Sequence, residues 1–182
     1  MNISSAEGNV DGVNDRGDRI PDRVDRIQDQ WRRERPELDP TPQGIIGRVH
    51  RLARALTDEL TAVYAEFGLS EPEFDLLATL RRSGEPYELL AGELAAHTMV
   101  TTGGLTKRVD RLVERGFVVR VPDAADQRQR RIRLTTEGRA LIDAAFTAHL
   151  ANEHRLVALL DAADATALRD ATRRWLAALG RD

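Results

Sequence analysis

The sequence contains no cysteine, and this absence excludes disulfide bonds, thiolate zinc sites and thiol-based redox sensing. Aromatic residues are also few, since only 4% of the chain is Phe, Trp or Tyr, so a core must consist mainly of aliphatic side chains. No apolar run approaches the roughly 20 residues that a membrane helix needs. Residues 1–18 are polar and lack the basic and apolar regions of a signal peptide. We therefore expect a cytoplasmic protein with no membrane partner and a disordered start over residues 1–18.

The charges are distributed unevenly along the chain. A formal net charge of −3 does not by itself indicate a nucleic-acid partner. Residues 101–135, however, carry nine cations against four anions, so this segment is +5 and the remainder of the chain is −8. A basic stripe on an acidic body is what a phosphate-binding face requires, although a charged surface that serves only solvation gives the same count.

Apolar residues recur mostly at the helical period, which predicts a largely helical chain. The predicted helices lie at 19–36, 43–67, 70–83, 88–96, 101–115, 136–160 and 164–179. Ser70 and Glu73 have the spacing of a capping box, and Gly68 is the expected stop of the preceding helix. The long helices within 43–67 and 136–182 carry more apolar surface than one small domain can cover. We therefore expect them to form the interface of a homodimer.

Residues 70–135 have the order of elements of a winged helix-turn-helix. Two short helices follow each other closely, and the second is followed by extended segments at 117–121 and 131–134 that predict a β-hairpin. In this plan the second helix enters the major groove of DNA and the hairpin, or wing, reaches the backbone or the minor groove. The expected fold class is therefore mainly α with a small antiparallel β wing.

The helix expected at 101–115 has a polar face opposite its apolar stripe. Two adjacent glycines near its start would be costly in a purely structural helix, but they allow backbone N–H groups to approach phosphates closely. A poor helix start without a role in DNA binding is the alternative interpretation. The DNA contacts expected from this helix are Thr101, Thr102, Gly103, Lys107 and Arg111.

The segment Asp126–Thr135, with the sequence DQRQRRIRLT, resembles the wing of the MarR family of transcriptional regulators. The family pattern is D-x-R-x-x-x-V/I-x-L-T, and the usual D-R-R is here D-Q-R. The resemblance implies that Arg128 enters the minor groove and that Asp126 braces it, with Arg130 and Arg131 replacing the missing cation. It covers about residues 43–179, and it implies a MarR-like dimer that binds double-stranded DNA at a pseudo-palindromic operator. Because the chain has no cysteine, no nucleophile motif and no phosphate-cradling glycine loop, we expect no catalytic residues and no cofactor.

Within this family the chain resembles the urate-responsive (PecS/HucR-type) branch, which has an extra N-terminal helix like that expected at 19–36. The resemblance implies a ligand pocket formed by Trp31, Asp75 and Arg120, with Arg108 as the relay to DNA. Each has a simpler interpretation. Trp31 is then an anchor for the extra helix, Asp75 and Arg120 are a structural ion pair, and Arg108 is an ordinary phosphate contact.

Two kinds of effector fit such a pocket, and we favour a urate-like purine over a tricarboxylate such as citrate or aconitate. A carboxylate at Asp75 accepts hydrogen bonds from purine ring N–H groups, whereas beside a trianion its like charge costs energy. Two other classes of protein stay open. The first is a metal-binding protein, because His149, Glu153 and His154 have the spacing to hold a metal ion, although we expect no metal. The second is an architectural DNA-binding protein that needs no ligand, and in such a protein Trp31 and Asp75 would have no function.

Overall fold

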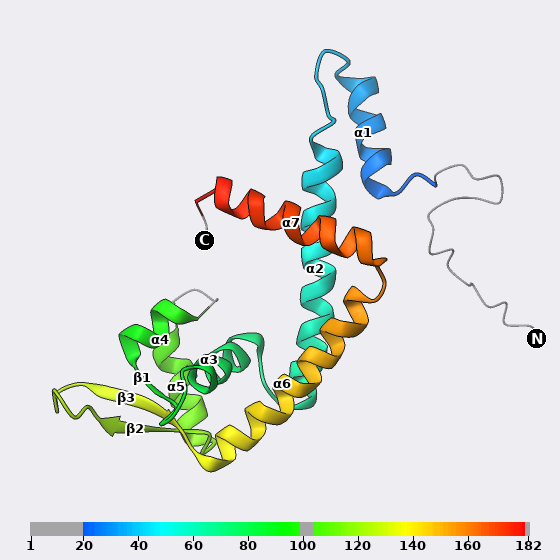
Figure 1. The fold of residues 1–182 in the computed structure, drawn as a ribbon. Helices are drawn as coiled ribbons and strands as arrows, with labels where there is room; N and C mark the ends of the chain where they lie inside the picture. The colour runs from blue at the N-terminus through cyan, green and yellow to red at the C-terminus, as the bar shows by residue number, and fades with distance from the viewer. Residues whose placement is uncertain (1–19, 99–103, 181–182) are drawn as a thin grey trace, which may run out of the picture. The chain divides into compact units, whose positions relative to one another are not determined.

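The computed structural model describes residues 20–98 and 104–180 (Figure 1). The elements are α1 (Arg23–Glu34), α2 (Gln43–Glu66), α3 (Glu71–Arg82), β1 (Glu88–Leu90), α4 (Ala91–His97), α5 (Leu105–Glu114), β2 (Val118–Pro122), β3 (Arg130–Leu134), α6 (Thr136–Val157) and α7 (Ala162–Ala178). The chain divides into two compact units, residues 1–57 and 58–182, and α2 contributes to both. None of the described helices combines the length and apolar character needed to cross a lipid bilayer.

The described part of the first unit is a helical hairpin of α1 and the start of α2. Asp22 caps α1 by accepting hydrogen bonds from the N–H groups of Val24 and Asp25, at 2.7 and 2.9 Å. The two helices approach closely at Gly47, where a Cβ atom would lie 3.3 Å from the Val24 side chain. Arg48 of α2 reaches back to α1 and pairs with both Asp22 and Asp25. Packing and ion pairs together hold α1 on α2.

The core of the second unit surrounds α3. Every residue from 73 to 80 is buried, because α3 is covered by α6 and by the helices and strands that follow it. The carboxylate of Glu73 accepts hydrogen bonds from the N–H and the hydroxyl of Ser70, at 2.9 and 2.7 Å, which fixes the start of the helix as the capping-box spacing predicts. Gly68 adopts a positive φ of 65° after the end of α2, as its predicted role as a helix stop requires.

The sheet has three antiparallel strands in the order β1-β3-β2, and Leu89 and Arg120 both oppose Ile132. The hairpin of β2 and β3 confirms the predicted wing. The prediction of a helix from Glu88 was wrong at its start, because residues 88–90 form β1 and α4 begins at Ala91. Pairing with β3 satisfies the backbone groups of this short segment, and that partner is supplied by residues about 40 positions away.

The boundaries of the last two helices also differ from those predicted. Helix α6 ends at Val157 instead of residue 160, and α7 begins at Ala162, before the expected start at Asp164. The cause is Asp161, whose carboxylate accepts the N–H of Asp164 at 2.7 Å and so caps a helix that begins two residues earlier than expected. The observed helices and the small antiparallel sheet confirm the expected fold class, mainly α with a small antiparallel β wing.

Candidate nucleic-acid interface and ligand pocket

Helix α5 has a buried face and a cationic face. Val109 and Leu112 are buried and attach the helix to α3 and β2, whereas Lys107 and Arg111 are exposed. Gly104 precedes the helix with a φ of 88°, a conformation that favours glycine. The predicted contacts Thr101, Thr102 and Gly103 lie outside the described residues.

Arg108 lies at the flank of α5 and is half-buried. Its guanidinium carbon lies 3.9 Å from the position that a Cβ atom of Gly104 would occupy, so the side chain folds back over the first turn of the helix. A larger residue at position 104 would meet this guanidinium. Arg108 thus lies against the start of α5, between the cationic face and the buried face of this helix.

The tip of the wing is braced by Asp126. Its carboxylate accepts the backbone N–H of Arg128 at 3.0 Å and the side-chain amide of Gln129 at 3.2 Å, and so fixes the turn from which Arg128 projects. The brace acts on the backbone of Arg128 and leaves its side chain exposed. The neighbouring Arg130 donates to the carbonyl groups of Gln127 and Gln129, at 2.6 and 3.1 Å.

Arg131 has a different environment from the other wing arginines. Its Nε atom lies 2.5 Å from a carboxylate oxygen of Asp123, and its guanidinium lies 3.9 Å from both Glu88 and Glu93. Three carboxylates therefore surround this cation and tie the wing to β1 and α4. This makes Arg131 the least available of the predicted wing cations for a phosphate group.

Asp123 is a structural residue of the wing that the sequence interpretation missed. It is only 6% exposed, and it accepts the backbone N–H groups of Ala125 and Asp126, at 2.8 and 2.9 Å. The hydrogen bond from the Asp126 N–H, and next the one from Arg131, hold the pKa of this carboxyl group below its ordinary value. The available signal was an aspartate at the start of a polar turn, which is a typical position for such a side chain–backbone bond.

The residues that the family resemblance assigns to a ligand pocket have separate partners. Asp75 lies on α3, is 8% exposed, and has a carboxylate oxygen 3.9 Å from Arg82 Nη1. Arg120 of β2 lies 2.5 Å from a carboxylate oxygen of Asp110 and so connects the wing to α5. The structure therefore gives Asp75 and Arg120 ion pairs with Arg82 and Asp110, and not the mutual pair considered from the sequence. Trp31 belongs to the first unit, where it is 44% exposed beside the segment 38–43.

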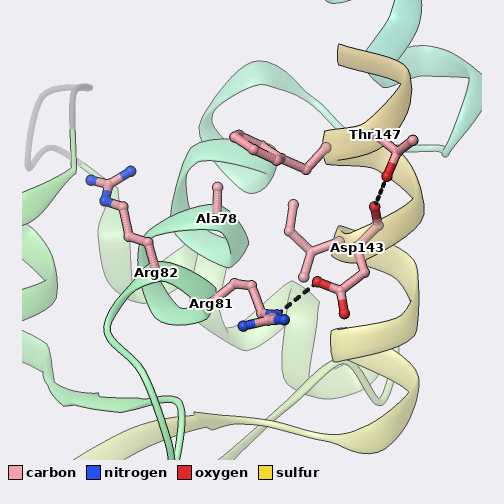
Figure 2. Close-up of a pocket in the computed structure, with 7 residues that line it drawn as sticks. Ala78, Arg81, Arg82, Asp143 and Thr147 are labelled. Carbon is pink, nitrogen blue, oxygen red and sulfur yellow. Dashed lines mark hydrogen bonds and ion pairs between the residues drawn. The ribbon is translucent and has the colours of Figure 1, made fainter. Parts of the chain in front are cut away.

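A cavity of about 510 Å³ lies between α3 and α6 (Figure 2). Arg81 donates from Nε to Asp143 at 2.7 Å on one side, and Arg82 lies on the other. The apolar part of the wall comes from Ala78, Ile142 and Phe146. An apolar wall beside a guanidinium suits a planar organic anion, and Arg82 connects the cavity to the buried Asp75.

The histidine of the possible metal site has other contacts. His149 lies 3.2 Å from the hydroxyl of Tyr64 through Nδ1 and 3.2 Å from Glu153 through Nε2. Burial, together with the charges of Glu71, Glu153 and Asp75, raises the pKa of Tyr64 to about 12. In the part of the chain that the structure describes, no three His, Asp or Glu residues are placed to hold a metal ion.

The helices α4 and α5 followed by the hairpin of β2 and β3 define a winged helix-turn-helix DNA-binding protein. A model of the MarR family matches residues 67–129. The HTH-type transcriptional regulator PecS of Dickeya dadantii is 39% identical over 77% of this chain and 84% of its own. The HTH-type transcriptional repressor Rv2887 of Mycobacterium tuberculosis is 32% identical over 68% of this chain and 86% of its own. The chain belongs to the MarR family and is a transcriptional regulator, not an enzyme.

Solved structures of the family share this fold. AbsC of Streptomyces coelicolor has a TM-score of 0.69 at 25% identity, over 80% of this chain and 98% of that one. A mutant MarR of E. coli complexed with operator DNA has a TM-score of 0.63 at 24% identity, over 74% of this chain and 94% of that one. BpsR of Bordetella bronchiseptica, whose DNA binding is regulated by 6-hydroxynicotinic acid, has a TM-score of 0.57 at 22% identity, over 69% and 90%.

Proposed function

We propose that the chain is a cytoplasmic, homodimeric repressor that binds a pseudo-palindromic operator and is released from it by a small anionic ligand. The observation that carries this proposal is the pairing of two exposed cationic features, the Lys107 and Arg111 face of α5 and the braced Arg128 at the wing tip. The first suits the major groove and the second the minor groove. The complex of the related MarR with operator DNA and the name of the repressor Rv2887 support the same role.

The proposed dimer is supported by apolar surface on α2, α6 and α7. Among the described residues, α7 contributes none that is buried, although it carries Leu168, Trp175 and Leu176. The side chain of Ile45 on α2 is 63% exposed and that of Leu159 after α6 is 67% exposed. Exposed apolar side chains on several helices mark an interface, and a second copy of the chain is the proposed partner.

For the ligand we propose a planar, nitrogen-containing heteroaromatic anion, with a urate-like purine favoured. The cavity between α3 and α6 offers the Arg82 guanidinium for negative charge and an apolar wall for a flat ring. The carboxylate of Asp75, 3.9 Å from Arg82, is an acceptor for ring N–H donors. A tricarboxylate is the alternative, but it would meet Asp143 in the cavity wall, and Asp75 behind Arg82, as like charges. Regulation of BpsR by 6-hydroxynicotinic acid supports the planar class.

The resemblance to the urate-responsive branch also assigns ligand roles to Trp31 and Arg120 and a relay role to Arg108, and we keep these three roles in the proposal. Arg120 bonds Asp110 of α5, so a ligand that draws Arg120 away would alter the attachment of the wing to the recognition helix. Arg108, folded over the start of the same helix, would change with it. These roles rest on the resemblance to the urate-responsive branch and on the contacts of each residue.

The experiment measures release of fluorescent operator DNA by urate, 6-hydroxynicotinate and citrate, for the wild type and Asp75→Asn. Glu137→Gln, an exposed carboxylate on α6, is the control of equal charge. We expect urate to release DNA from the wild type and from the control, and to be at least tenfold less potent on Asp75→Asn. Release by citrate alone, unchanged or improved in Asp75→Asn, would reject the planar ligand. Failure to bind any operator-like duplex would reject the regulator itself.

A further inference from the structure

We propose that a groove between α1 and α2, in the first unit, is a second ligand site that binds an amphiphilic anion, with an apolar body and one acidic head group. The groove has a volume of about 630 Å³, within the range of roughly 300–1,000 Å³ that is typical of small-molecule sites. Its lining combines three arginines with three aliphatic side chains, namely Arg23, Arg51, Arg54, Val24, Ile27 and Ile46.

The three arginines of the groove are available to an external anion. None of their guanidinium groups forms an ion pair or hydrogen bond with another residue in 20–98 or 104–180, whereas the nearby Arg48 is neutralised by Asp22 and Asp25. A guanidinium remains charged at any physiological pH and matches the geometry of a carboxylate or phosphate. Three such groups around one groove give a strong local preference for negative charge.

The floor of the groove is apolar and partly open to solvent. Val24 is buried against Gly47, while Ile27 and Ile46 are 38% and 42% exposed. Exposed aliphatic surface favours an apolar partner, and here it adjoins the cations. A purely ionic ligand would leave this floor uncovered and a purely apolar one would leave the arginines unpaired. The combination points to an amphiphile.

The groove lies on the opposite side of α2 from the surface that we assign to the dimer. At 100° per residue, one side of the helix carries the exposed stripe of Ile45, Val49, Leu52 and Leu56. The other side carries the groove residues Ile46, Gly47, Arg51 and Arg54. If the stripe is buried between two copies, the groove still faces solvent, so the site and the proposed dimer are compatible.

The test is calorimetric titration of the full-length protein with decanoate, below the concentration at which it forms micelles. Decyl phosphate, decanol and acetate are the comparison ligands. Arg54→Gln and the double variant R51Q/R54Q remove cations of the groove, and Arg33→Gln removes an exposed cation from α1 outside it. We expect decanoate or decyl phosphate to bind, decanol and acetate not to bind, Arg54→Gln to weaken binding several-fold, and the double variant to weaken it at least tenfold. The head group that binds more tightly identifies the acid that the site prefers.

Several results would overturn the proposal. They are absence of binding by both anions, equal affinity of Arg54→Gln and Arg33→Gln, or binding of decanol as tight as that of decanoate. Loss of decanoate binding in Asp75→Asn would place the ligand in the other cavity. Circular dichroism and melting temperatures are the control for folding. Because the substituted arginines are exposed, we expect both to be unchanged in the arginine variants. An altered affinity then does not reflect unfolding.

Discussion

Gly138, in the first turn of α6, offers a quantitative test of the junction between the wing and the long helix. A Cβ atom at this position would lie 1.9 Å from the carbonyl oxygen of Phe117, far inside van der Waals contact. The same oxygen accepts the N–H of Thr135 at 3.1 Å, so the backbone cannot withdraw without weakening that bond. Overpacking costs about 1–3 kcal/mol and the hydrogen bond about 1 kcal/mol, while alanine in place of glycine gains at most about 1 kcal/mol of helix propensity.

We therefore expect Gly138→Ala to destabilise the protein by roughly 1–3 kcal/mol, which lowers the melting temperature of a chain of this size by about 2–12 °C. The matched control is Gly92→Ala, in the first turn of α4, where a Cβ atom meets nothing within 4 Å. This control should be neutral or raise the melting temperature slightly. Both are measured by thermal unfolding at one protein concentration, since a dimer couples stability to concentration. Equal melting temperatures for the two variants would refute the reasoning.

Three further predictions concern the wing and the assembly. Arg128→Ala should weaken operator binding by roughly 1–3 kcal/mol per half-site. The slope of log affinity against log salt concentration should fall by about one unit for each phosphate that the variant no longer neutralises. Fluorescence anisotropy at several salt concentrations measures both quantities, with Arg33→Gln as the control. Asp123→Asn should destabilise the wing at neutral pH, because the lowered pKa of Asp123 contributes stability above about pH 4 that is lost as the pH falls through the folded-state pKa. A stability difference from the wild type that does not shrink as the pH falls below about 4 would contradict this. Light scattering at micromolar concentration should give the mass of a dimer, and the mass of a monomer would argue against the proposed interface.

The arrangement of helices and wing could be predicted because its signals are local. The capping pair Ser70 and Glu73, the stop at Gly68 and the alternation within β3 each depend on a few neighbouring residues. The strand β1 could not be predicted in this way, because three residues become a strand only through pairing with β3. The early start of α7 is set by the capping bond of Asp161, which the spacing of apolar residues along the helix does not report.

The candidate site was less predictable than the fold. Sequence reasoning identified the exposed cations of α5 and the carboxylate of Asp126 at the wing tip, but it did not foresee the three carboxylates around Arg131, and it overlooked Asp123. Which charged side chains neutralise each other is decided by packing between distant segments, as the pairing of Arg120 with Asp110 illustrates. The cavity beside Arg82 was also missed, since its walls come from two helices about 60 residues apart in the sequence.

The junction between β3 and α6 consists of one residue, Thr135, whose hydroxyl donates to the Gly116 carbonyl at 2.7 Å and accepts the Gly138 N–H at 2.9 Å. Adding or removing a single residue here would turn every side chain of α6 by about 100° relative to the wing and shift it by about 1.5 Å along the helix axis. In the proposed dimer, the length of this junction would therefore set the angle at which each wing meets DNA. The loop at the wing tip can tolerate an insertion or deletion. The same change at Thr135 would alter the spacing of the operator half-sites that the protein can bind.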